Sequence, residues 1–295
     1  MKKVIALVLA ALMVMFVFSF AGCSNNSEPE YAFTPDGYPK VDGSTATIPL
    51  SEQFFANATG VSLEDAATYI QHNTTHNAYV NLIEDKCDII FVTSPSEEEY
   101  ALAKEAGIEL EVYPVVNEAF IFMVNKENPV SDLSQAQIVD IYTDKITNWS
   151  EVGGEDKEII AYQREVNSGS QTGFLDLVMG DTEPADAPTE KRIEGMGGLV
   201  EAISGYDNSD QALGYSYYFY VNEMYVRDGV KLISVDGIAP TPETIADGSY
   251  PYTTAYYAVL RSDEPADSAA RELLDWVLSD DGQAAAKEAG YVPLG

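Results

Sequence analysis

The chain has 295 residues, of which 48 are acidic and 16 are basic, giving a formal net charge of −32. This balance argues against nucleic acid as the main partner, because binding a phosphate backbone requires clustered lysine and arginine. With 46% hydrophobic residues and only two cysteines, Cys23 and Cys87, the composition is that of a globular protein held together by its core and not by a disulfide framework.

The first 22 residues are typical of an export signal. Two lysines precede an apolar run from Val4 to Phe18, and Ala21-Gly22 come directly before Cys23. This arrangement resembles the lipobox of bacterial lipoproteins, in which cleavage leaves Cys23 as the lipid-bearing N-terminus. An uncleaved membrane anchor is the alternative, and both interpretations place the rest of the chain outside the cytoplasm. Removal of residues 1–22 would leave 14 basic and 48 acidic side chains, a charge of −34.

Beyond the signal, the pattern predicts a tether followed by an α/β body. Residues 23–40 contain several Pro, Gly, Asn and Ser residues, so we expect a solvated tether and a core that begins at about Val41. Apolar runs then alternate with helical segments. Buried strands are expected at 87–93 and 119–125, and two helices at 266–279 and 280–290. A further helix at 96–107 has Ser96 as its N-cap and Glu99 completing a capping box.

Residues that commonly perform catalysis or bind metals form no convincing group. His72 and His76 are four residues apart, but the Asn-Thr-Thr between them indicates a turn, and no cysteine or carboxylate nearby supports a metal site. Cys87 starts a predicted buried strand, which favours a small core residue over a nucleophile. We therefore expect neither an enzyme nor a metal or cofactor.

Two segments place small hydroxyl residues and glycine before a helix. In Asp42–Phe55, Pro49 is suited to the first turn of a helix, and hydroxyl residues precede it. In Tyr162–Met179, a Ser-Gly-Ser-Gln sequence leads into an apolar helical run, with Arg164 just upstream. Helix N-termini carry unpaired N–H groups and partial positive charge, and arginine suits an oxyanion, so the combination predicts an anion site.

The motifs together resemble one known family. They are DGSTATIPL, the run from Ile141 to Phe174 containing ITNW, GG, QRE and SGS, then ALGYSYY, and the segment from Val235 to Leu260. In this order, they resemble the phosphate-binding proteins of bacterial ABC uptake transporters, a type II periplasmic-binding-protein family. The resemblance covers nearly the whole mature chain.

This resemblance implies an α/β, two-lobed periplasmic-binding-protein type II fold with a ligand cleft between the lobes. The first lobe would comprise 41–116 and 252–295, and the second 117–251. The implied ligand is inorganic phosphate, delivered to ABC permease subunits by a monomer that is lipid-anchored to the cell membrane. The implied phosphate ligands are Thr47, Ile48, Thr74, Thr93, Ser94, Arg164, Ser168, Gly169 and Ser170, with Ser44, Thr45 and Thr75 as further contributors.

One departure from the family concerns selectivity. Well-known members carry an aspartate after the strand that corresponds to 87–93, where this chain has Thr93-Ser94-Pro95. A hydroxyl accepts a hydrogen bond from protonated phosphate but does not repel a proton-free anion as a carboxylate does. Two alternative functions therefore remain: a receptor for sulfate, molybdate or a phosphorylated metabolite, and a surface sensor or adhesin that keeps the fold.

Overall fold

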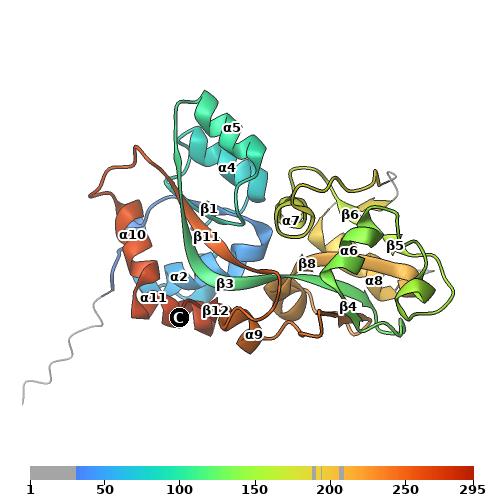
Figure 1. The fold of residues 1–295 in the computed structure, drawn as a ribbon. Coiled ribbons are helices and arrows are strands. Elements are labelled where there is room, and N and C mark those ends of the chain that lie inside the picture. Colours follow the sequence, from blue (N-terminus) through green and yellow to red (C-terminus); the bar gives the residue numbers. More distant parts are fainter. Residues whose placement is uncertain (1–30, 188–190, 194, 206–208) are drawn as a thin grey trace, which may run out of the picture. The chain divides into compact units, whose positions relative to one another are not determined.

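A computed structural model describes residues 31–187, 191–193, 195–205 and 209–295, and its centre is a mixed β-sheet (Figure 1). The sheet has eight strands in the order β1-β2-β11-β3-β8-β5, and β12 and β9 also pair with β3. The β1–β2 and β5–β8 pairs are parallel and the others are antiparallel. The strands are β1 (Val41–Gly43), β2 (Ile89–Val92), β3 (Leu110–Asn125), β5 (Ile160–Ala161), β8 (Ala212–Tyr217), β9 (Val230–Leu232), β11 (Thr253–Arg261) and β12 (Val292–Pro293).

The 16-residue strand β3 connects the two ends of this sheet. Its first part pairs with β11, from Leu110 opposite Arg261 to Ala119 opposite Thr253, and its last part pairs with β8. Figure 1 shows β3 running from the side that carries α4 and α5 to the side that carries α6 and α8. Two further sheets consist of two short parallel strands each. One pairs β4 (Asp132–Leu133) with β10 (Ser234–Val235), and the other pairs β6 (Gln163–Arg164) with β7 (Arg192–Ile193).

Helices surround the sheet. They are α2 (Ile48–Thr59), α3 (Leu63–Ala66), α4 (Thr75–Ile83), α5 (Glu97–Glu105), α6 (Gln135–Tyr142), α7 (Gly169–Gly173), α8 (Met196–Gly205), α9 (Pro242–Ala246), α10 (Ala269–Leu278) and α11 (Asp280–Glu288). Segments of π-helix follow α7 (Phe174–Met179) and β8 (Tyr220–Met224). Within the described ranges, no helix combines the length and the apolar character needed to cross a membrane.

The locally encoded elements form as predicted. Ser96 caps α5, and Ser96 and Glu99 make both hydrogen bonds of the capping box, while Gly107 lies beyond the helix at φ 76°. Pro49 occupies the first turn of α2, where a missing N–H costs nothing. The two C-terminal helices form as α10 and α11, and the two predicted strands form as β2 and part of β3. These predictions succeed because each depends on residues within one helical turn or one strand.

The predicted tether extends too far. Phe33 donates its backbone N–H to Ala58 O at 2.9 Å, and the rings of Phe33 and Tyr38 lie edge-on at 5.4 Å. Tyr38 packs in turn against Phe55 of α2, with ring centroids 4.8 Å apart. The expectation that no core begins before about Val41 is therefore wrong, because two aromatic rings attach residues 33–38 to the outside of α2.

The described chain from Ala32 onward forms one compact unit. The predicted lobe boundary at 116/117 falls within β3, and the one at 251/252 lies just before β11. The exact lobe limits stay a prediction. The predicted signal peptide and Cys23 lie outside the described residues.

Candidate functional site

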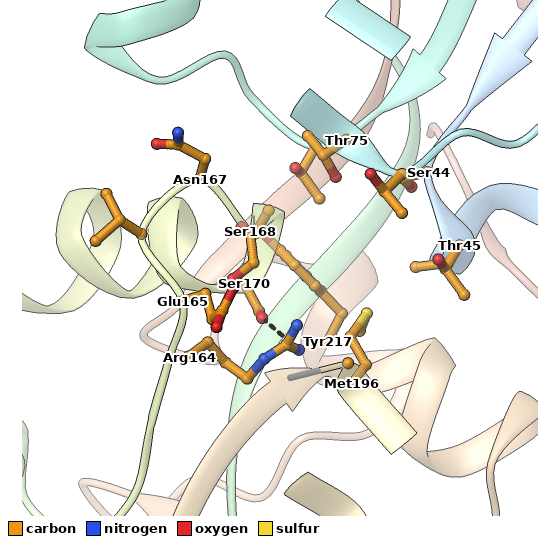
Figure 2. Close-up of a pocket in the computed structure, with 16 residues that line it drawn as sticks. Ser44, Thr45, Thr75, Arg164, Glu165, Asn167, Ser168, Ser170, Met196 and Tyr217 are labelled. Atoms are coloured by element: carbon orange, nitrogen blue, oxygen red, sulfur yellow. Dashed lines mark hydrogen bonds between the residues drawn. The ribbon is translucent and has the colours of Figure 1, made fainter. Parts of the chain in front are cut away.

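A cavity of about 410 Å³ lies between two sets of loops and helix ends. One side comes from the segment before α2, the start of α4 and the end of β2; the other comes from β6, the loop after it, α7 and the start of α8 (Figure 2). Its lining residues are Ser44, Thr45, Ala46, Thr74, Thr75, Thr93, Arg164, Glu165, Val166, Asn167, Ser168, Gly169, Ser170, Gly195, Met196 and Tyr217. Small polar side chains thus surround a single cation among the described lining residues.

On the first side, a short 3-10 turn (Thr45–Thr47) sets the entry into α2. Ser44 donates its backbone N–H to Phe91 O at 3.0 Å, which attaches the turn to β2. The Thr47 hydroxyl donates toward Phe91 O at 2.6 Å and also lies 3.0 Å from Ser44 O. Ser44 and Thr45 are left facing the cavity.

The start of α4 contributes Thr74 and Thr75. Thr74 has φ 68° and ψ 164°, a backbone conformation that glycine adopts readily and a β-branched residue adopts only under strain. No side chain caps this helix among the described residues. The N–H groups of its first turn, which have no partner within the helix, therefore remain available at the cavity edge.

Thr93, directly after β2, is 2% exposed and lines the cavity. Its hydroxyl lies beside that of Tyr217, on which it acts as a hydrogen-bond partner, but the geometry of this pair is poor and no other described residue supplies a hydrogen bond. A buried hydroxyl with such weak hydrogen bonding costs free energy, so a ligand atom at this place would complete its hydrogen bonding.

On the second side, Arg164 in β6 is only 7% exposed. Its Nε donates to Ile193 O at 2.9 Å, and its Nη1 lies 3.3 Å from Ser170 Oγ (Figure 2). Its backbone N–H donates to Gln171 Oε1 at 2.9 Å and to the Tyr215 hydroxyl at 3.0 Å. Burial lowers the pKa of the guanidinium, which nonetheless stays charged because arginine does not deprotonate in proteins.

Arg164 has no described carboxylate within ion-pair distance, in contrast to Arg261, which contacts Asp85 at 2.6 Å and Asp263 at 3.1 Å. A buried cation without a counter-charge is strongly unfavourable. The cavity that it lines is therefore suited to an anion.

The loop after β6 and the start of α7 supply the remaining polar groups. Ser168 caps α7 by accepting the Gln171 N–H at 3.2 Å, which leaves the hydroxyl proton of Ser168 free to donate. The Tyr217 hydroxyl donates to Gly169 O at 3.0 Å and so fixes the α7 backbone from β8. Ser170 is 2% exposed beside Arg164.

Most of the residues implied by the family resemblance come together here. Those that line the cavity are Ser44, Thr45, Thr74, Thr75, Thr93, Arg164, Ser168, Gly169 and Ser170.

Three of the implied residues are absent from the cavity lining, and their contact with the ligand stays a prediction. The hydroxyl of Thr47 is engaged by backbone carbonyls, and the backbone N–H of Ile48 donates to Thr45 O. Ser94 also lies outside the lining. The 3-10 turn inserted before α2 explains the first two, because it presents Ser44 and Thr45 to the cavity in their place.

The sequence reasoning missed seven lining residues, namely Met196, Tyr217, Ala46, Glu165, Val166, Asn167 and Gly195. Tyr217 belongs to the aromatic segment 215–221, and both Tyr215 and Tyr217 are buried. Nothing in the local pattern separates Tyr217, whose hydroxyl reaches the cavity wall, from its neighbours. Met196 begins α8 and carries no motif.

The two histidines and Cys87 have separate roles. His72 Nε2 lies 2.9 Å from Ser51 Oγ, and burial lowers the pKa of this histidine to about 4. His76 Nδ1 lies 3.0 Å from Glu99 Oε1. Cys87 is buried, and burial raises the pKa of its thiol to about 12, so it is a core residue as predicted. The described residues contain no group of three or more potential metal ligands.

Comparisons with known proteins agree with this architecture. The model of the PBP superfamily domain matches residues 34–281. The chain is 27% identical over 301 residues to the phosphate-binding protein PstS of Bacillus subtilis (strain 168), covering 98% of this chain and 94% of that one. It resembles the structure of a protein from Clostridium perfringens, assigned as a phosphate ABC transporter substrate-binding protein with bound phosphate, at a TM-score of 0.66 and 26% identity over 87% of this chain and 99% of that chain.

A further neighbour, the structure of an ABC-type phosphate transport receptor from Vibrio cholerae, has a TM-score of 0.62 at 24% identity, over 86% of this chain and 98% of that one, and supports the fold alone. The chain belongs to the periplasmic-binding-protein superfamily and has its type II α/β fold. This confirms the family resemblance drawn from the sequence motifs. The family consists of solute-binding proteins and not of enzymes.

Proposed function

We propose that this protein captures inorganic phosphate outside the cytoplasm and delivers it to the permease of an ABC importer. The observation that carries the proposal is Arg164, a buried cation without a described counter-charge, at a cavity lined by hydroxyls. The relatives named phosphate-binding proteins support phosphate as the anion.

The binding energy would come from many short neutral hydrogen bonds and one charged pair. Phosphate must lose its hydration shell in the cavity, and hydroxyls of Ser168, Ser170 and Thr93 together with the start of α4 would replace it. Arg164 would balance the charge. The charge of −32 on the whole chain opposes an approaching anion at long range, but salt screens that repulsion beyond about 10 Å. Affinity therefore depends on the site itself.

Glu165 is the acidic residue among the described lining residues. Its side chain is exposed to solvent, so water screens its charge and it does not cancel the buried Arg164.

The test is titration calorimetry on the full chain, purified in detergent and freed of bound phosphate by dialysis. Phosphate, sulfate, molybdate and a phosphate monoester are titrated separately, with a buffer-only control. We expect saturable one-to-one binding of phosphate, stronger than that of the other three anions. Stronger binding of another anion would assign the site to that anion, and binding of none would refute an oxyanion receptor.

We further propose that Cys23 carries a lipid anchor, on the strength of the sequence that precedes it. Cys23→Ala should block lipidation and either release the protein or leave its signal uncleaved. N-terminal sequencing and membrane fractionation measure this. Unchanged processing with membrane retention would disprove the lipobox.

Delivery to a permease is tested by phosphate uptake in cells with and without the gene.

A further inference from the structure

Asp42 is a buried carboxylate next to the cavity, but it does not line it. It is 1% exposed in β1, and no described lysine, arginine or histidine lies within ion-pair distance. A buried charge without a cation needs several hydrogen-bond donors to be tolerated. Such an arrangement so near a proposed anion site requires an explanation.

Four N–H groups supply those donors. Asp42 Oδ1 accepts from the backbone N–H of Gly43 at 2.7 Å and of Asn73 at 2.9 Å. Its Oδ2 accepts from Asn73 Nδ2 at 2.9 Å and from Asn81 Nδ2 at 2.7 Å. Asn73 directly precedes Thr74, and Asn81 lies two turns along α4. One carboxylate therefore attaches both the loop before α4 and the helix itself to β1.

This attachment explains the conformation of Thr74. A threonine at φ 68° and ψ 164° persists only where its surroundings impose the strain. Asn73, which directly precedes Thr74, is held by two hydrogen bonds to Asp42 and so restricts the backbone at this point. Thr74 and Thr75 then both line the cavity at the uncapped start of α4.

We propose that Asp42 is a positioning residue for the anion donors of the α4 side. Its carboxylate holds Asn73 and the start of α4 in the binding geometry, so affinity depends on a residue that does not touch the ligand. The inference rests on the proposed function only for the identity of the anion.

The test compares Asp42→Asn with Asp88→Asn in the full chain. Asp88 is a matched control, because its Oδ2 accepts the Lys40 backbone N–H at 2.7 Å in the same part of the fold without contacting the α4 loop. An asparagine at 42 presents an NH₂ group where donors now point. We expect the phosphate Kd to rise about tenfold or more in Asp42→Asn, the effect of losing one charged hydrogen bond, and to change less than about twofold in Asp88→Asn.

A double-mutant cycle separates positioning from general destabilisation. In a Thr75→Val background, Asp42→Asn should lose less affinity than in the wild type, because a donor it positions is already gone. Ser170 lies on the other side of the cavity, so the affinity losses caused by Asp42→Asn and by Ser170→Ala should be additive in the double variant. Additive losses with both partners would overturn the proposal.

Hydrogen exchange without ligand gives an independent readout. Asp42→Asn should accelerate exchange at residues 73–77 and leave 169–173 unchanged, and equal rates in both proteins would overturn the proposal. This measurement decides the role of Asp42 even if the wild type binds no anion, a result that would refute the proposed function instead. If Asp42→Asn does not fold, Asn81→Ala removes a single donor and should show the same pattern more weakly.

Discussion

Gly169 and Thr75 lie so close across the cavity that no side chain fits between them. A β-carbon at position 169 would lie 2.6 Å from Thr75 Oγ1 and 2.5 Å from Thr93 Oγ1, both well inside contact distance. Gly169 begins α7 and Thr75 begins α4, so this contact joins the two sides of the cavity.

Gly169→Ala should therefore weaken phosphate binding by about tenfold or more, because the added methyl group prevents the two helix starts from approaching. The fold should survive, since alanine is a better helix former than glycine. Calorimetry gives the affinity and thermal unfolding gives the stability. Gly205→Ala is the matched control, because a β-carbon there meets nothing within 4 Å. Equal affinities in the two variants would mean that this contact does not limit binding.

Arg164→Ala should reduce phosphate affinity by about tenfold to a hundredfold or more, since charged hydrogen bonds contribute about 1.5–3 kcal/mol each. Without phosphate, removing an uncompensated buried charge should cost little stability. Arg192→Ala serves as the control, because Arg192 is exposed and its nearest described carboxylate is 3.7 Å away. A folded Arg164→Ala protein with unaltered affinity would locate the site elsewhere.

Thr93→Asp should increase the preference for phosphate over sulfate, on the order of tenfold. Phosphate keeps a proton that an aspartate accepts, whereas sulfate has none and leaves the buried carboxylate repelled. Competitive binding is measured across the pH range in which phosphate loses its second proton. Ser94→Asp, next in sequence but outside the cavity lining, should change the ratio much less. A wild type that already excludes sulfate, with no effect of Thr93→Asp, would indicate a different proton acceptor.

Glu118 predicts a pH dependence of stability. It is 2% exposed in β3, its Oε1 accepts the Ala119 N–H at 2.8 Å, and burial raises its pKa from 4.5 to about 8. The folded state therefore holds a proton that the unfolded state loses, so the contribution of Glu118 to stability is fully present below about pH 4.5 and is lost as pH rises to about 8.

Glu118→Gln should flatten this dependence and be more stable than the wild type at pH 8, by roughly 4 kcal/mol at most. Urea unfolding at several pH values between 5 and 8 measures the difference. Glu109→Gln, at an exposed position, should follow the wild type. Parallel pH curves for the wild type and Glu118→Gln would show that Glu118 is ionised in the folded protein.

The sequence allows local features to be predicted better than contacts between distant segments. The capping box of Ser96 and Glu99 and the place of Pro49 were predictable because all the interacting atoms lie within one turn. The choice between Thr47 and Ser44 was not, because it depends on whether a 3-10 turn precedes α2. Tyr217 reaches the cavity only because β8 pairs with β3, a contact between segments about 100 residues apart.

The position of β11 in the sheet has a consequence for biogenesis. This strand, residues Thr253–Arg261, lies between β2 and β3, although both of those strands are complete by Asn125. For a chain exported N-terminus first, as proposed above, two hydrophobic strands cross the membrane before their shared neighbour. Their unpaired backbone edges are exposed to association with other chains until the last sixth of the protein is across. Folding should be slow and post-translocational, and truncation before Thr253 should yield aggregates and not a smaller binding protein.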